Sequence, residues 1–186
     1  MLFVSLIIII SLTLYIISIH NSFIKKINAV KESKSGIKIQ IKKKLDLIPN
    51  LLKVLQKYMS YEESLLKDLV KIREGSSIEN TESLTTLNSD IDNIFKSAQL
   101  KVEAYPDLKS SEQFLSFNKE LSSIETNIAA ARRIFNMSVN SYNNSIQVFP
   151  NSILANIQKK TVEKLFSSEN DDLLNKSLDI DFEKSK

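Results

Sequence analysis

The sequence predicts an all-α protein in which an N-terminal transmembrane helix is followed by an antiparallel up-down four-helix bundle. The 186 residues include only 2 glycines and 3 prolines, too few turn-forming residues to favour a β fold. Residues 2–19 contain no charged side chain. Beyond them, apolar residues recur at alternating intervals of three and four, which is the spacing of one face of a helix.

Residues 1–24 are predicted to form a membrane anchor. As a helix, residues 2–19 would rise about 27 Å, close to the hydrocarbon thickness of a bilayer. A cleaved signal peptide is the alternative, but no basic residue precedes the apolar run and no A-x-A-like cleavage site follows it. Because Lys25, Lys26 and Lys31 follow the run, the positive-inside rule predicts a single-pass inner-membrane protein with a cytoplasmic C-terminal domain.

Residues 25–150 are predicted to form the four-helix bundle. A helix continues out of the membrane, and a second begins near Leu51 and stops at Gly75. A third begins at Ser76, with Glu79 completing a capping box, and stops before Pro106. The stripe of the first helix has these members: Ile27, Val30, Lys34, Ile37, Ile41, Lys44 and Ile48.

The fourth helix has the clearest signal, starting after a capping box of Ser110 with Gln113. Its apolar positions alternate three and four apart without a slip and resemble a coiled-coil seam that ends at Pro150. The predicted seam consists of Phe114, Phe117, Leu121, Ile124, Ile128, Ala131, Phe135, Ser138, Tyr142, Ser145 and Phe149.

Pro49 raises the question of where the first helix ends. A proline inside a helix costs about 3 kcal/mol, whereas in the first turn its missing N–H has no intrahelical partner. With Asp46 as an N-cap, a break at 45–48 is favoured over an interior kink. We therefore expect Asp46, Pro49 and Asn50 to form the first of three chain reversals, near residues 46, 75 and 107.

Four strings identify a family. DLIPNL (46–51), AYPDLK (104–109), ETNIAAARRIFN (125–136) and SYNNSIQVFPNSI (141–153) occur in this order. The chain resembles the LemA family of bacterial membrane-anchored helical proteins from residue 1 to about 155. The resemblance implies one N-terminal transmembrane helix and a four-helix antiparallel domain. It implies no reaction, because the family has no accepted biochemical activity, and its relatives in magnetotactic bacteria suggest a membrane-organising role by analogy.

Few features of the sequence indicate catalysis. Glu62, Glu63, Glu120 and Glu125 could include an acid–base pair, but solvated helix faces explain them more simply. The chain lacks cysteine and a glycine-rich phosphate loop, and its single histidine, His20, lies at the membrane boundary. We therefore expect neither an enzyme nor a cofactor nor a metal site. The net charge of +3 is too small to indicate a nucleic-acid partner.

Two further groups of residues are candidates for interaction. Arg132 and Arg133 either form salt bridges with neighbouring helices or bind an anion or partner. Tyr142 is expected to form a hydrogen bond inside the bundle, beside Asn143.

The C-terminal part divides into two segments. Residues 151–166 are amphipathic, and they either lie at the membrane interface or cap the open end of the bundle. Bundle topology would return this segment to the bilayer, where Lys159, Lys160 and Lys164 join Lys25, Lys26 and Lys31 as candidate membrane-surface residues. Residues 167–186 are predicted to be an acidic disordered tail.

The functional prediction is a non-catalytic scaffolding or membrane-organising protein. Its expected partners are membrane lipid, further copies of itself and other membrane-associated proteins. The alternative is an accessory or sensor protein that couples to a signalling enzyme or protease at the membrane.

Overall fold

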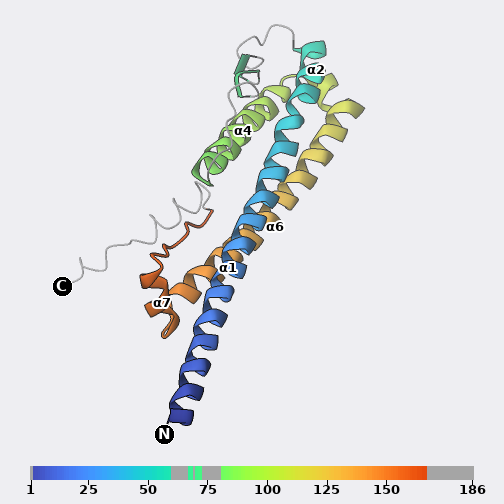
Figure 1. The fold of residues 1–186 in the computed structure, drawn as a ribbon. Helices are drawn as coiled ribbons and strands as arrows, with labels where there is room; N and C mark the ends of the chain where they lie inside the picture. Colours follow the sequence, from blue (N-terminus) through green and yellow to red (C-terminus); the bar gives the residue numbers. More distant parts are fainter. Residues whose placement is uncertain (1, 60–66, 69, 73–80, 167–186) are drawn as a thin grey trace, which may run out of the picture. The chain divides into compact units, whose positions relative to one another are not determined.

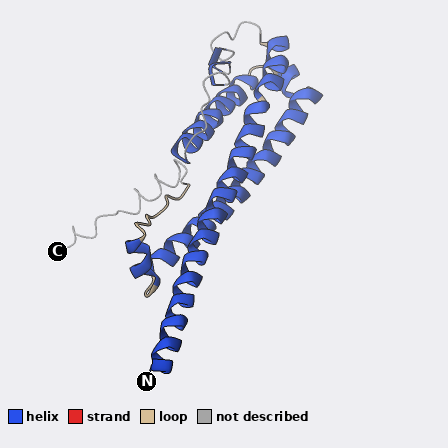
Figure 2. Cartoon of the chain, viewed as in Figure 1, coloured by secondary structure: helices blue, strands red, loops and turns tan. Residues whose placement is uncertain are grey.

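The computed structural model describes residues 2–59, 67–68, 70–72 and 81–166, and each element with defined bounds in this part of the chain is a helix (Figures 1 and 2). The helices are α1 (Leu2–Asp46), α2 (Ile48–Tyr58), α4 (Thr81–Val102), α5 (Pro106–Lys109), α6 (Glu112–Gln147) and α7 (Asn151–Ile157). The all-α prediction is confirmed. The expected cap at Gly75, the capping box at Ser76 and the acidic tail lie outside the described residues.

The chain forms two compact units, and α1 and α6 contribute to both. Unit 1 comprises Met1–Ile37 and Ala131–Leu165, and unit 2 comprises Lys38–Ala130 and Phe166–Lys186.

Unit 1 pairs the first part of α1 with the last part of α6. The Lys26 ammonium donates a hydrogen bond to the Ser141 carbonyl at 3.3 Å, and Ala29 shares a shallow groove with Ile134 and Met137. Residues later in α1 thus contact residues earlier in α6, so the two helices are antiparallel. Many of the buried residues recur every three, four or seven positions, as expected of packed helices: Phe23, Val30, Phe135, Val139, Tyr142 and Ile146.

Unit 2 brings together the end of α1, α2, α4, α5 and the first part of α6. The rings of Phe95 on α4 and Phe117 on α6 meet edge to face with centroids 5.6 Å apart, and Phe114 stacks on Phe117 at 6.2 Å. The Gln99 amide lies 3.5 Å from the Asn118 amide oxygen. Apolar stripes from each helix bury the core: Ile41, Ile48, Leu51, Leu55, Leu84, Ile91, Phe95, Ala98, Val102, Leu108, Leu121 and Ile124.

The helix break near Pro49 is confirmed, but the chain reversal predicted there is wrong. Leu47 alone separates α1 from α2, and its backbone stays in the right-handed helical region (φ −76°, ψ −21°). The amides of Asn50 and Leu51 both donate to the Leu47 carbonyl at 3.0 Å. Because the helical turn persists across the break, α2 continues in the direction of α1 (Figure 1). Asp46 ends α1 and makes no cap, and the proline falls in the first turn of α2.

The connection from α4 to α6 follows the prediction with a shift of one residue. α4 ends at Val102, and Pro106 opens the short helix α5. The Phe114 amide donates to the Ser111 hydroxyl at 3.3 Å, so Ser111 is the N-cap of α6 rather than Ser110. The Ser110 hydroxyl instead donates to the Pro106 carbonyl at 2.9 Å, which closes α5.

Gly36 lies in the interior of α1 without a steric need for glycine. Its φ is not positive, and a Cβ built there meets nothing within 4 Å. We expect Gly36→Ala to raise the free energy of unfolding by about 0.5–1 kcal/mol, because alanine loses less backbone entropy in a helix. Urea unfolding of the detergent-solubilised chain measures this, with Ser35→Gly as the opposite change. A destabilised Gly36→Ala variant would contradict the prediction.

Candidate functional site

The most deeply buried charged side chain described in the structure is Lys44, at the end of α1 in unit 2. Its side chain is 0% exposed, and its ammonium forms ion pairs with Asp92 of α4 and Glu125 of α6. The Asn88 amide oxygen lies 3.4 Å from the ammonium, and the Asn88 amide nitrogen donates to Asp92 at 2.9 Å. We call these four residues the Lys44 cluster. They connect α1, α4 and α6 through one cation.

The position of Lys44 follows from its place on the apolar stripe of α1. Ile37, Ile41 and Ile48 are fully buried on the same stripe, so the lysine stem is buried with them. Asp92 and Glu125 are 32% and 42% exposed, so the two carboxylates remain in partial contact with water. This arrangement neutralises a buried cation and links three helices through it.

An open groove of about 790 Å³ begins beside the Lys44 cluster and runs between α4 and α6. Asp92 and Glu125 form one end, and Lys109 binds Glu103 at 2.7 Å at the other. Its walls combine apolar and polar side chains: Phe95, Lys96, Gln99, Val102, Phe114, Leu115, Asn118, Leu121 and Ser122. The groove therefore offers an apolar floor between two ion pairs.

The predicted acid–base candidates are not gathered in one site. Glu125 belongs to the Lys44 cluster, whereas Glu120 lines a shallow groove of about 450 Å³ between α2 and α6. Glu62 and Glu63 lie outside the described residues. Among the residues that the structure describes, no group of three or more His, Cys, Asp or Glu side chains is arranged to hold a metal ion.

The candidate turn residues in unit 2 lie at the surface. Asp46 is exposed, Pro49 is half-buried, and Asn50 is exposed at the edge of the groove that contains Glu120.

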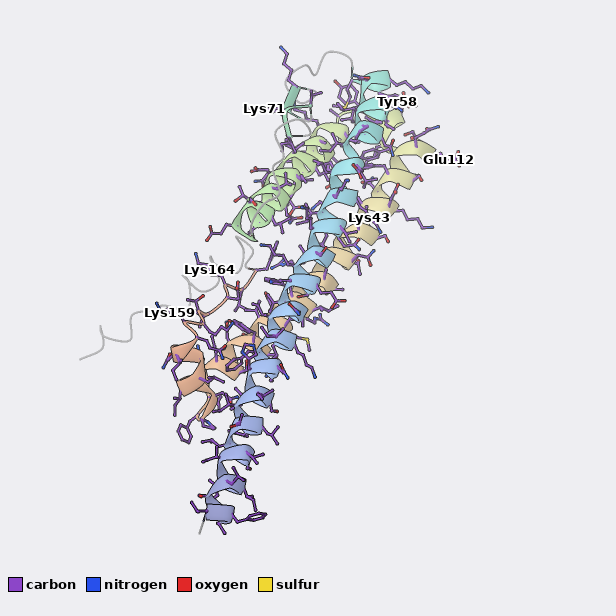
Figure 3. All side chains as sticks on the ribbon, in the orientation of Figure 1. Lys43, Tyr58, Lys71, Glu112, Lys159 and Lys164 are labelled. Carbon is purple, nitrogen blue, oxygen red and sulfur yellow. The ribbon has the colours of Figure 1, made fainter. Side chains whose placement is uncertain are left out.

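The candidate lysines of unit 1 have different surroundings. Lys25 and Lys31 are exposed, while Lys26 is half-buried and bonded to the Ser141 carbonyl. The remaining three lie on the segment after α7: Lys159 and Lys164 are exposed, and Lys160 is half-buried (Figure 3). Lys159 ends α7 with a positive φ of 51°. Residues 151–166 are therefore one short helix followed by an irregular segment, not one amphipathic helix.

Asn143 holds the irregular segment against α6. Its amide nitrogen donates to the Glu163 carbonyl and its amide oxygen accepts from the Glu163 N–H, both at 2.9 Å. Tyr142 beside it is 3% exposed, as predicted for a seam residue. On the same helix, Arg132 is half-buried and Arg133 is exposed.

We expect Asn143→Ala to release residues near Glu163. Each lost hydrogen bond contributes a net of about 0.5–1.5 kcal/mol, so the Glu163 amide should exchange roughly tenfold faster. Hydrogen exchange of the full chain measures this, and Asn144→Ala, an exposed neighbour, is the control. Equal protection of the Glu163 amide in both variants would refute the role of Asn143.

We expect the burial of Tyr142 to make the folded protein less stable above pH 10. Burial, and secondarily the nearby Glu163 charge, raise the pKa of Tyr142 above its ordinary value of 10.0. Below pH 10 the phenol is protonated in both folded and unfolded chains. As the pH rises from 10 through the folded pKa, the unfolded chain loses the proton first, and stability falls by up to about 1.4 kcal/mol per pH unit.

The comparison of wild type with Tyr142→Phe isolates this contribution. We expect the difference in unfolding free energy between the two proteins to shift in favour of the variant between about pH 9 and about pH 11. Parallel stability curves over that range would contradict it.

Sequence reasoning missed the role of Lys44, although a signal for it was present. A lysine on an otherwise aliphatic stripe needs an acidic partner, and Asp92 and Glu125 directly follow the stripe positions Ile91 and Ile124.

Over the residues that the structure describes, these features define a helical protein with an exposed apolar N-terminal helix and two helical units. The chain belongs to the LemA family: the family model matches residues 33–182, which confirms the resemblance seen in the sequence. The protein LemA of Metamycoplasma hominis is 30% identical over 132 residues, covering 69% of this chain. The matched region spans 60% of the length of that relative.

Proposed function

We propose that this protein is anchored in a membrane by α1 and acts there as a non-catalytic scaffold. The observation that carries the anchor is the exposure of the apolar run. All described side chains from Leu2 to Ser18 are exposed, and the apolar window long enough to cross a membrane is 6% buried. A core helix of a soluble protein would be mostly buried. An apolar surface of this length is matched by a bilayer.

The basic residues after the span support an orientation. Lys25 and Lys31 are exposed immediately beyond the apolar run. By the positive-inside rule this end of α1 faces the cytoplasm of a bacterial inner membrane.

The scaffolding role is supported by exposed apolar side chains along α6. Phe117, Ile128 and Phe135 of this helix are buried, whereas Leu115, Ile134 and Met137 remain 57%, 57% and 66% exposed. Apolar side chains presented along a long helix provide contact surface for partner proteins or further copies of the chain.

In-cell photo-crosslinking of the full-length membrane form tests the proposal. A photo-reactive amino acid at Leu115 or Met137 should capture the chain itself or another membrane-associated protein, whereas one at Leu14 in the span should capture mainly lipid. Capture of lipid alone at all three positions would contradict scaffolding. Specific capture of one signalling enzyme or protease would instead support an accessory role.

A further inference from the structure

The turn from α6 into α7 exposes a group of large apolar side chains. Val148 is 58%, Phe149 76%, Ile153 55% and Ile157 72% exposed, and we call these four residues the apolar turn surface. The seam pattern predicts Phe149 in the core, and that prediction is wrong. α6 ends at Gln147, and Ile146 is buried instead.

The apolar turn surface lies at the level where the exposed apolar run of α1, Leu2 to Ser18, ends. The Gln158 amide oxygen, one residue after Ile157, is 3.3 Å from His20 Nδ1. Ile19 is the first buried side chain of α1, so protein packing on this helix begins at the same level. Figure 2 shows the turn as the tan loop between α6 and α7, at the end of the unit that faces the N-terminus of α1.

The length of this exposed run determines how deep in a bilayer this level would lie. The exposed helix from Leu2 to Ser18 rises only about 26 Å, whereas the hydrocarbon core of a bilayer is about 30 Å thick. If α1 spans the membrane, the interface therefore reaches at least to His20. The apolar turn surface beside Gln158 then lies at the depth of the headgroups and the first acyl carbons.

The charge of unit 1 favours lipid as the occupant of this surface. The unit carries nine lysine and arginine side chains against Glu32 and Glu163, and no acidic residue occurs between 126 and 162. Lys159 and Lys160 directly follow the apolar turn surface, where they can meet anionic headgroups. Basic residues next to exposed aromatic and aliphatic side chains are the pattern of interfacial binding.

We propose that the apolar turn surface inserts into the bilayer interface beside the anchor and makes a second membrane contact. The partner is the anionic lipid surface itself. The inference rests on the proposed membrane anchor, and it assigns the depth and orientation of unit 1 on that membrane.

The chain contains no tryptophan, so single-tryptophan variants report depth without background. Full-length Phe149→Trp is reconstituted into anionic vesicles with or without lipids brominated on the upper acyl chain. We expect blue-shifted emission that the brominated lipids quench. Ile157→Trp, at a second exposed site, should behave alike, and its agreement guards against a misfolded Phe149→Trp variant.

Two control positions separate this inference from the anchor on which it rests. Met137→Trp, exposed on α6 further from the turn, should remain unquenched, while Leu14→Trp in the span should be quenched. Quenching at Leu14 without quenching at Phe149 and Ile157 overturns the interfacial contact and leaves the anchor intact. Absence of quenching at Leu14 overturns the anchor itself. Blue-shifted but unquenched emission at Phe149 would assign the surface to protein contact and also overturn the inference.

Discussion

Replacing Lys44 by alanine should lower the free energy of unfolding by about 2–4 kcal/mol. Breaking a buried ion pair from one side costs about 3–5 kcal/mol, and the partial exposure of Asp92 and Glu125 reduces this because water can solvate the remaining carboxylates. The alanine also removes a fully buried aliphatic stem. Urea unfolding of the full chain in mild detergent, followed by far-UV circular dichroism, measures the loss.

Lys43→Ala is the matched control, because Lys43 is exposed on the same turn of α1. It should change stability by less than about 0.5 kcal/mol. Equal losses for Lys43 and Lys44 would contradict the structural role of the cluster.

A second pair of variants separates charge from packing. Lys44→Met keeps most of the buried stem and should cost about 1–2 kcal/mol, because it leaves two carboxylates without their cation. Adding Asp92→Asn removes one of these charges, so the double variant should be less destabilised than the sum of the single changes. Strict additivity would indicate that Lys44 stabilises the unit through its stem alone.

The buried faces of the helices could be predicted from the sequence because burial follows helical periodicity. Ile37, Ile41 and Ile48 on one stripe, and Phe117 and Ile128 on another, are buried as expected. A spacing of three and four places such side chains on one face whatever the helix packs against. This information is local, so it survives without knowledge of the tertiary structure.

The direction of the chain at Pro49 could not be predicted in the same way. A proline in the first turn of a new helix is tolerated whether the chain reverses or continues. In both cases the N–H that proline lacks would have had no partner within the new helix. The decision depends on Leu47, which keeps helical dihedral angles and is 3% exposed in the core. Burial of that side chain is a tertiary effect that capping rules do not contain.

The Lys44 cluster shows the same limit. Its partners lie 48 and 81 positions away in the sequence, on helices whose register becomes known only in the folded structure. In the sequence, Lys44 is a lysine within an otherwise apolar stripe. Only the folded structure shows that it is the most buried charged side chain among the described residues.

The seam of α6 fails at its end for a geometric reason. The alternation of three and four continues in the sequence to Phe149, but helical rotation ends at Gln147. Past that residue, the sequence spacing no longer reports which way a side chain points. Within α6, Val139 and Ile146 are buried, whereas Phe149, beyond the end of the helix, is 76% exposed.

Truncating two phenylalanines of this pattern should thus have opposite outcomes. Phe135 is 1% exposed, and Phe135→Ala should lower the free energy of unfolding by about 3–5 kcal/mol, through lost apolar burial and the cavity left behind. Phe149→Ala in the same detergent should change it by less than about 0.5 kcal/mol, because little of that ring is packed against protein.

The same urea unfolding measurement distinguishes the two accounts of the seam. If Phe149→Ala were as destabilising as Phe135→Ala, the heptad-like pattern would extend past Gln147 and Phe149 would belong to the core. With the expected contrast, the ring of Phe149 contributes little to the free energy of folding in detergent. Its contribution would then be confined to the membrane-bound chain, where removing the ring costs contact with lipid instead of contact with the protein interior.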